Sequence, residues 1–278
     1  MIKKIITCSI KIISYSILIL SLPFCNLQKD IYVQLPEHEK QIVVECYLEP
    51  GKPYRLLLTE STAFEASPLP NVIVPAIVTI TYKGKMDTLK PIPTIDTAYH
   101  KFYNYVSDQI VQYDTIHDYF LNIKLLTTLK QIKAQTRFMP FILIHSIRFV
   151  VRNDSSASLR LVVLDPPYKK NYYRLIVNGD TLQKPERFKQ TFSDEFFDNG
   201  RITFISNFRF FVGEPLVVTL YHLTPEHYYF LKSIQDATSA SSNPFTVPSQ
   251  IKSNIVGGTG IFTTLSYDRK YVIVNRND

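Results

Sequence analysis

The sequence contains no tryptophan and lacks two short signatures of the common hydrolases. Lectins that stack sugars commonly use large flat rings, so the missing tryptophan argues against a sugar-stacking lectin. Neither Gly-x-Ser-x-Gly nor His-Glu-x-x-His occurs, so no serine-hydrolase or zincin site can be recognised. We expect no enzyme, no catalytic residues, no metal site and no cofactor. A surface hydrolase assembled from dispersed residues stays open as an alternative.

The charge of the chain is neither strong nor clustered. The 31 Lys and Arg outnumber the 24 Asp and Glu, which gives a net charge of +7. Lys3, Lys4 and Lys11 lie in residues 1–24, which contain no acidic residue, so loss of that segment lowers the net charge by three to +4. Nucleic-acid-binding proteins cluster their basic residues, and here they are scattered. We therefore expect no nucleic-acid partner.

The N-terminal residues have the pattern of a bacterial lipoprotein signal. Lysines precede an apolar run over residues 12–24, and Cys25 follows that run directly. The run is too short and too interrupted to span a membrane, which needs about 20 apolar residues. Leu22 lies three residues before the cysteine, as such signals require, although Phe24 stands where a small residue is usual.

This pattern predicts that residues 1–24 are removed and that Cys25 becomes a lipidated N-terminus carrying acyl chains such as palmitate. One acyl chain holds a protein only marginally, whereas two or more anchor it stably. The polar residues 25–39 are then a tether between the lipid and the first domain. An uncleaved N-terminal anchor and secretion without lipid are the two alternatives.

Cysteine is scarce, with one residue at each of positions 8, 25 and 46. With Cys8 cleaved off and Cys25 lipidated, Cys46 stands alone, so we expect no intrachain disulfide and no cysteine-based zinc site. The alternation over residues 42–48 places Cys46 on one face with Ile42, Val44 and Leu48. Free cysteine behaves as a small hydrophobe, so we predict a buried core thiol.

Short runs rich in β-branched and aromatic residues recur along the chain and predict strands. Turn residues separate them, as in residues 49–53 and 82–85. The expected strands are 41–48, 54–60, 76–82, 86–89, 119–125, 129–136, 145–151, 158–164, 171–177, 202–207, 216–221, 262–267 and 271–275. Helices that would connect parallel strands are missing, so the pattern predicts a mainly β protein of two β-sandwich-like domains.

The strand pattern restarts around Met139-Pro140-Phe141, which places a domain boundary near residues 138–143. Residues 40–140 are predicted to form an N-terminal Ig-like β-sandwich. Residues 141–278 are predicted to form a C-terminal β-rich domain with one α-helix packed on it.

That helix is expected near residues 225–237, where Thr224 can cap it and Pro225 suits its first position. Glu226 would lie at its positive end. Helical spacing predicts a stripe that faces the core. The stripe contains His227, Phe230, Leu231, Ile234 and Ala237.

Two acidic or histidine-containing groups could bind a metal. The acidic residues of 194–198 are interrupted by Phe196 and Phe197, which breaks the alternate spacing of a calcium loop, so we expect an acidic loop entering an Asn-Gly hairpin turn. His117 lies among Tyr113, Asp114 and Asp118, the best local group for a metal or acid–base role. A solvated loop is the favoured interpretation.

The C-terminal third contains a more specific pattern, which runs from Asn243-Pro244-Phe245 to Gly257-Gly258-x-Gly260-Ile261-Phe262. Three other segments accompany it: residues 42–47, Asp165-Pro166 followed by residues 171–174, and residues 213–218 leading to 228–231. Together they resemble the domain-of-unknown-function 4249 family of bacteroidete outer-membrane lipoproteins. Cys46 stands where glycine is expected in that family. The resemblance covers nearly all of the chain after the signal.

The resemblance implies an outer-membrane lipoprotein, on the periplasmic or cell-surface face, often encoded beside a TonB-dependent transporter. We expect an accessory or substrate-binding partner of such a barrel, and an envelope structural or assembly lipoprotein is the alternative. The C-terminal segment would be an interaction loop or a structural clasp, and its Gly- and Pro-rich composition favours a clasp. Its residues are Asn243, Pro244, Phe245, Pro248, Asn254, Gly257, Gly258, Gly260 and Phe262. The glycines do not form a phosphate loop, because no Lys-Ser/Thr and no helix follow them.

Overall fold

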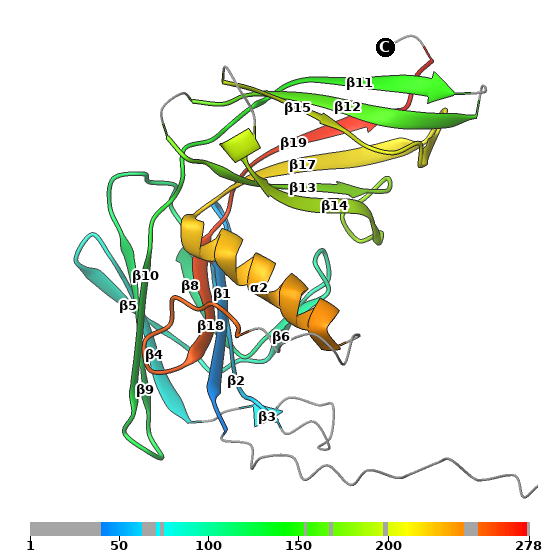
Figure 1. Cartoon of the computed structure of the whole chain (residues 1–278). Helices are drawn as coiled ribbons and strands as arrows, with labels where there is room; N and C mark the ends of the chain where they lie inside the picture. The colour runs from blue at the N-terminus through cyan, green and yellow to red at the C-terminus, as the bar shows by residue number, and fades with distance from the viewer. Residues whose placement is uncertain are drawn as a thin grey trace, which may run out of the picture. The chain divides into compact units, whose positions relative to one another are not determined.

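The computed structural model describes residues 40–62, 71–72, 75–152, 155–166, 169–196, 200–241 and 250–276. These residues belong to one compact unit, Glu39–Asp278. The described part is mainly β, with four larger sheets arranged as two sandwiches and one long helix, as the sequence predicts (Figure 1).

The first sandwich packs two sheets around a common core. One sheet contains β1 (Ile42–Leu48), β2 (Pro53–Glu60), β3 (Asn71–Val72), β8 (Tyr105–Ile110) and β18 (Thr259–Thr264). The other contains β10 (Gln131–Thr136), β9 (Tyr119–Leu125), β4 (Ala76–Tyr82) and β5 (Lys85–Leu89). A separate hairpin joins β6 (Thr94–Asp96) to β7 (Lys101–Tyr103). Alternate residues of β1, β9 and β10 are buried, which is the period expected of half-buried strands.

The second sandwich also packs two sheets around a common core. One sheet contains β11 (Ile144–Arg152), β12 (Ser156–Leu164), β15 (Arg201–Ile205) and β16 (Phe210–Phe211). The other orders β14 (Glu186–Ser193), β13 (Tyr172–Asn178), β17 (Pro215–Leu223) and β19 (Ser266–Ile273). Apolar residues from both sheets form its core, among them Leu161, Leu175, Val218 and Phe210.

Helix α2 (Pro225–Ser241) begins at the predicted cap, because the Thr224 Oγ1 accepts a hydrogen bond from the His227 backbone N at 3.2 Å. The helix packs against β13 and β14 of the second sandwich and also against β18 of the first (Figure 1). His227, Phe230 and Ser233 form its buried stripe. Ile234 is 39% exposed, so its predicted core position is wrong. The buried residues follow one another at a spacing of three, and Ile234 lies beside this row on the solvent side. None of the described helices has the length and apolarity to cross a bilayer.

Two predicted turns differ from the structure. The break between the last two strands lies at Leu265, because β18 already starts at Thr259 inside the glycine-rich segment and runs parallel to β1. The expected hairpin after the acidic loop is absent, because β15 pairs with β12 and not with β14. That loop, with the short 3-10 helix η1 (Asp194–Phe196), crosses between the sheets of the second sandwich.

Candidate functional site

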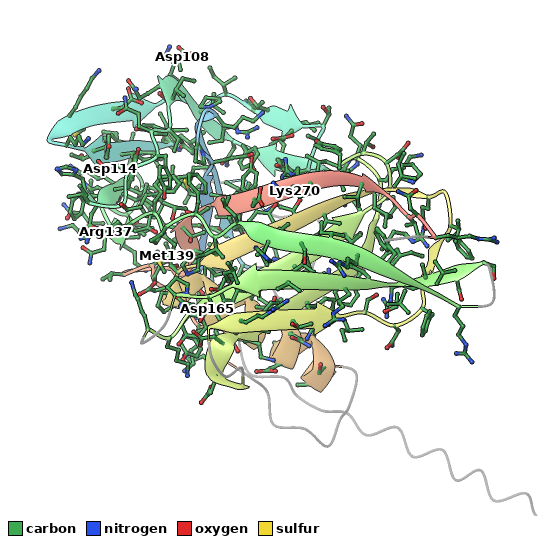
Figure 2. The ribbon with its side chains drawn as sticks, turned by 90° about the horizontal axis from the view of Figure 1, so that it is seen from above. Asp108, Asp114, Arg137, Met139, Asp165 and Lys270 are labelled. Carbon is green, nitrogen blue, oxygen red and sulfur yellow. The ribbon has the colours of Figure 1, made fainter. Side chains whose placement is uncertain are left out.

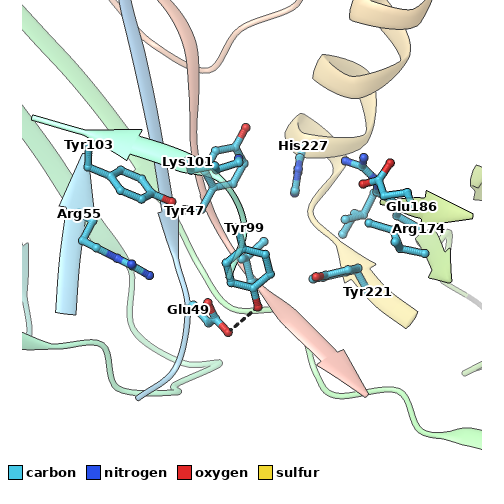
Figure 3. A pocket seen from close by; sticks show the side chains of 13 residues that line it. Tyr47, Glu49, Arg55, Tyr99, Lys101, Tyr103, Arg174, Glu186, Tyr221 and His227 are labelled. Carbon is cyan, nitrogen blue, oxygen red and sulfur yellow. Dashed lines mark hydrogen bonds between the residues drawn. The ribbon is translucent and has the colours of Figure 1, made fainter. Parts of the chain in front are cut away.

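A cavity of about 180 Å³ lies between the two sandwiches, beside the first turn of α2 (Figure 3). Its walls come from β1, β2 and the β6–β7 hairpin on one side. They come from β13, β14 and β17 on the other side. Strands are rigid supports, so this arrangement holds its side chains in fixed positions. Concave sites where two packed units meet are common places for ligands.

Three basic side chains of the cavity have no carboxylate partner among the described residues. The Lys101 Nζ lies 3.8 Å from the centroid of the Tyr47 ring, and neither Lys101 nor Arg174 is within ion-pair distance of an acid. His227 is 3% exposed, and its Nδ1 is buried without a hydrogen-bond partner. Buried polar groups are nearly always paired, so this group is unusual.

The surroundings of these groups disfavour positive charge. Burial, together with the nearby charges of Arg174 and Lys101, lowers the pKa of His227 to about 3, so the imidazole is neutral at pH 7. Burial also lowers the pKa of Lys101; Glu45 opposes this effect, and Arg174 adds to it. The like charges of Lys101 and Arg174 therefore lie close enough to affect one another.

The acids of the cavity, in contrast, are already engaged. Glu49 is 4% exposed, and its Oε1 accepts hydrogen bonds from the hydroxyls of Tyr99 at 3.2 Å and Tyr267 at 2.8 Å (Figure 3). Glu186, which is exposed at the cavity wall, pairs with the Nζ of Lys189 at 2.9 Å. The Arg55 side chain on β2 pairs with Asp96. The unpaired groups of the cavity are therefore basic.

In the described part of the C-terminal pattern, Asn254 is hydrogen-bonded to β18, the strand that pairs with β1. The Asn254 Nδ2 donates to the Phe262 carbonyl at 2.7 Å, and the Asn254 Oδ1 accepts from the Phe262 N at 3.0 Å. Phe262 is fully buried in the first core. Four residues of the predicted segment, namely Asn243, Pro244, Phe245 and Pro248, lie outside the described residues.

The glycines of this segment lie against backbone. A Cβ on Gly257 would lie 2.6 Å from the Gln131 carbonyl oxygen, and one on Gly258 would lie 2.9 Å from that of Ile42. At Gly260 the Val44 carbonyl oxygen would be only 2.0 Å away. Gly257 and Gly260 also have positive φ, +87° and +114°. A side chain fits at none of these positions without a shift of the neighbouring strand.

His117 belongs to a network of ion pairs. Asp114, which is labelled in Figure 2, lies at the centre of this network. It accepts hydrogen bonds from the Tyr82 hydroxyl at 2.7 Å and the His117 Nδ1 at 2.8 Å, and it pairs with Lys83 at 2.8 Å. The hydrogen bond from Lys83 holds the pKa of Asp114 well below its usual range. Asp118 pairs with Arg137. Within the described ranges, no group of three or more His, Cys, Asp or Glu could hold a metal ion.

Five other predicted positions have the following outcomes. Cys46 is fully buried in the first core, as predicted, and burial raises the pKa of its thiol. The Asp194 carboxylate accepts a hydrogen bond from the Asn171 N at 2.7 Å, and Glu195 pairs with Lys170 at 3.1 Å. Cys25 and Asp198 lie outside the described residues.

The sequence model of the domain of unknown function DUF4249 matches residues 28–271. The chain belongs to this family. No curated protein matches it. Among solved structures, a chain of a cytokine receptor complex is similar over 84% of this chain and 97% of its own, with a TM-score of 0.28 and 9% identity. A similarity of that size supports no argument about this DUF4249 protein.

Sequence reasoning missed the cavity of the DUF4249 protein. Arg174 lies in the 171–174 segment that carries the family resemblance, and strand alternation puts it on the face opposite the core residues Tyr173 and Leu175. A charged residue on a strand between buried neighbours was the available signal. No such signal marked Lys101, because β6 and β7 have three residues each, which is too few to show an alternation of buried and exposed residues. The prediction that no Ser-x-x-Lys pattern occurs is wrong, because Ser249 and Lys252 have that spacing. Ser249 lies outside the described residues, and Lys252 is exposed.

Proposed function

We propose that this DUF4249 protein is a lipid-anchored binding protein of the outer membrane, an accessory and substrate-binding partner of a TonB-dependent transporter barrel. The cavity carries the proposal. It is built on strands of both sandwiches, and among the described residues it leaves Lys101, Arg174 and the His227 Nδ1 unpaired. The N-terminal lipoprotein pattern and the family support the place at the membrane.

Binding suits the cavity better than hydrolysis does. Hydrolysis of acyl or glycosidic bonds needs a nucleophile with a base, or two carboxylates free to act on one bond. Within the described ranges, no serine or cysteine lines the cavity. Glu49 is held by two tyrosine hydroxyls, and Glu186 is paired with Lys189. We therefore propose no enzymatic activity.

Co-purification tests the transporter partnership. The tagged full-length protein, extracted in mild detergent from its own cells, is expected to retain an outer-membrane barrel protein identified by mass spectrometry. If no barrel is retained, the partnership is wrong. If deletion of the gene lowers barrel levels while uptake per barrel stays the same, the assembly role replaces the substrate-binding one.

The anchor is tested by Cys25→Ser. We expect this variant to move from the membrane fraction to the soluble fraction, because it loses every acyl chain at once. Cys8→Ser is the matched control, since it makes the same substitution inside the predicted signal and leaves the lipidated residue in place. Immunoblotting of the two fractions gives the measurement. A Cys25→Ser protein that stays with membranes would show that residues 1–24 are themselves the anchor.

A further inference from the structure

We propose that the cavity binds a small organic anion, a carboxylate or phosphate attached to a compact ring-bearing or apolar body, with its charged oxygens held by Lys101, Arg174 and His227. This inference rests on the proposed function as a binding protein and adds the chemistry of the ligand.

The charge balance of the cavity favours an anion. Lys101 is half-buried on β7, and Arg174 is half-buried on β13 across the cavity. Neither has a carboxylate within ion-pair distance among the described residues, and each disfavours the charge of the other. Charges taken out of water are costly unless an opposite charge accompanies them. An anionic group between these two side chains supplies that charge, and Arg can bind it with two parallel hydrogen bonds.

His227 adds a third, independent feature. Its side chain is 97% buried, and the Nδ1 has no partner within the described part of the chain. Figure 3 shows the ring between Lys101 on one side and Arg174 on the other. A neutral imidazole can donate one hydrogen bond from Nδ1 in the suitable tautomer. A ligand oxygen that reaches this nitrogen pairs it while the imidazole stays neutral.

The remaining walls define the body of the ligand. Tyr99, Tyr103 and Tyr221 present rings and hydroxyls, while Leu223 and Leu265 present apolar surface. A volume of about 180 Å³ is below the range of about 300–1,000 Å³ usual for drug-sized ligands. The cavity therefore suits a single small molecule and excludes a peptide or an oligosaccharide.

The position of the buried acid orients this molecule. Glu49 lies at the Arg55 end of the cavity, away from His227 and Arg174 (Figure 3). Its carboxylate would repel a second anion there. Glu186 lies beside Arg174 but is paired with Lys189, so the Lys101–Arg174–His227 end is the one that takes the charged end of the ligand. The tyrosine-rich end then receives the uncharged body.

Binding is tested on the purified chain with three probes of similar shape: benzoate, phenyl phosphate and the uncharged benzamide. At about 10 mM probe, we expect benzoate or phenyl phosphate to raise the thermal unfolding midpoint by about 2–4 °C and benzamide to leave it unchanged. The stronger of the two anions identifies the charged group. Calorimetric titration then gives the affinity.

Arg174→Gln and Lys101→Gln are each expected to weaken anion binding by about tenfold or more, because each removes a charge-assisted contact. Arg148→Gln on the exposed face of β11 is the matched control and should bind as the unchanged chain does. The unfolding midpoint without ligand confirms that each variant is folded. Equal shifts with benzamide and benzoate, no shift with any probe, or equal binding by the Arg174 and Arg148 variants would overturn the inference. Any of these results leaves the co-purification test of the transporter partnership unaffected.

Discussion

Gly260→Ala is expected to prevent β18 from pairing with β1 and to leave the protein misfolded or insoluble. The backbone φ of +114° at Gly260 is one that other residues rarely adopt, at a cost of about 1–3 kcal/mol. The added Cβ would also lie 2.0 Å from the Val44 carbonyl oxygen. Gly260 and Val44 are register partners, so neither backbone can move away while the strands stay paired.

The two costs can be separated with a matched control. Gly213 also has a positive φ, +85°, yet a Cβ there would meet nothing within 4 Å. Gly213→Ala is therefore expected to lose only about 1–2 kcal/mol of unfolding free energy, measured by urea denaturation. Gly260→Ala should lose several kcal/mol more, a large share of the roughly 5–15 kcal/mol that holds a domain folded. Similar losses for the two variants would show that β18 can shift away from β1.

The second large expected effect is acid destabilisation through His227. Its pKa is about 3 in the folded protein, against about 6.5 when unfolded. The unfolded chain therefore binds more protons as the pH falls below about 6.5, and stability is lost from there down to about 3. Each pH unit in this window costs about 1.4 kcal/mol, so about 3 kcal/mol is lost between pH 6.5 and pH 4.

His227→Phe should remove this dependence, because phenylalanine keeps the buried ring and has no titrating nitrogen. Urea unfolding between pH 6.5 and pH 4 is expected to show a shallower loss for the variant than for the unchanged chain. His222, whose pKa is also lowered by burial, contributes to both proteins and cancels in the comparison. Parallel pH profiles would mean that His227 becomes protonated in the folded state, for example by local opening around Lys101 and Arg174.

Local sequence signals predicted those parts of the fold that are set by residues close together in the sequence. Alternation alone located β1 and β9, because each has one face in a core. The Thr224 cap and the buried Cys46 follow from the same short-range patterns. The Lys83-Gly84 turn also forms as predicted, with positive φ at both residues.

The features that escaped prediction depend on contacts distant in sequence. Gly260 is a strand residue because Val44, more than two hundred positions earlier, lies beside it. The cavity combines Lys101 with Arg174 and His227, which no single segment contains. β14 is mostly exposed and polar, so it lacks the alternation that marks other strands. Ile234 is exposed because the neighbouring strands, and not the helix period alone, select the buried stripe.

The pairing of β18 with β1 also constrains the order in which the chain can fold during synthesis. The first sandwich cannot complete its sheet or its core until residues 254–264 have been synthesised, because Ile255 and Phe262 belong to that core. Until then the β1 edge lies open, and an open strand edge is a template for aggregation. Pairing between strands so far apart in the sequence is slow. A chain truncated before this segment would therefore fold poorly, and holding chaperones would matter most while the last strand of this sheet is still missing.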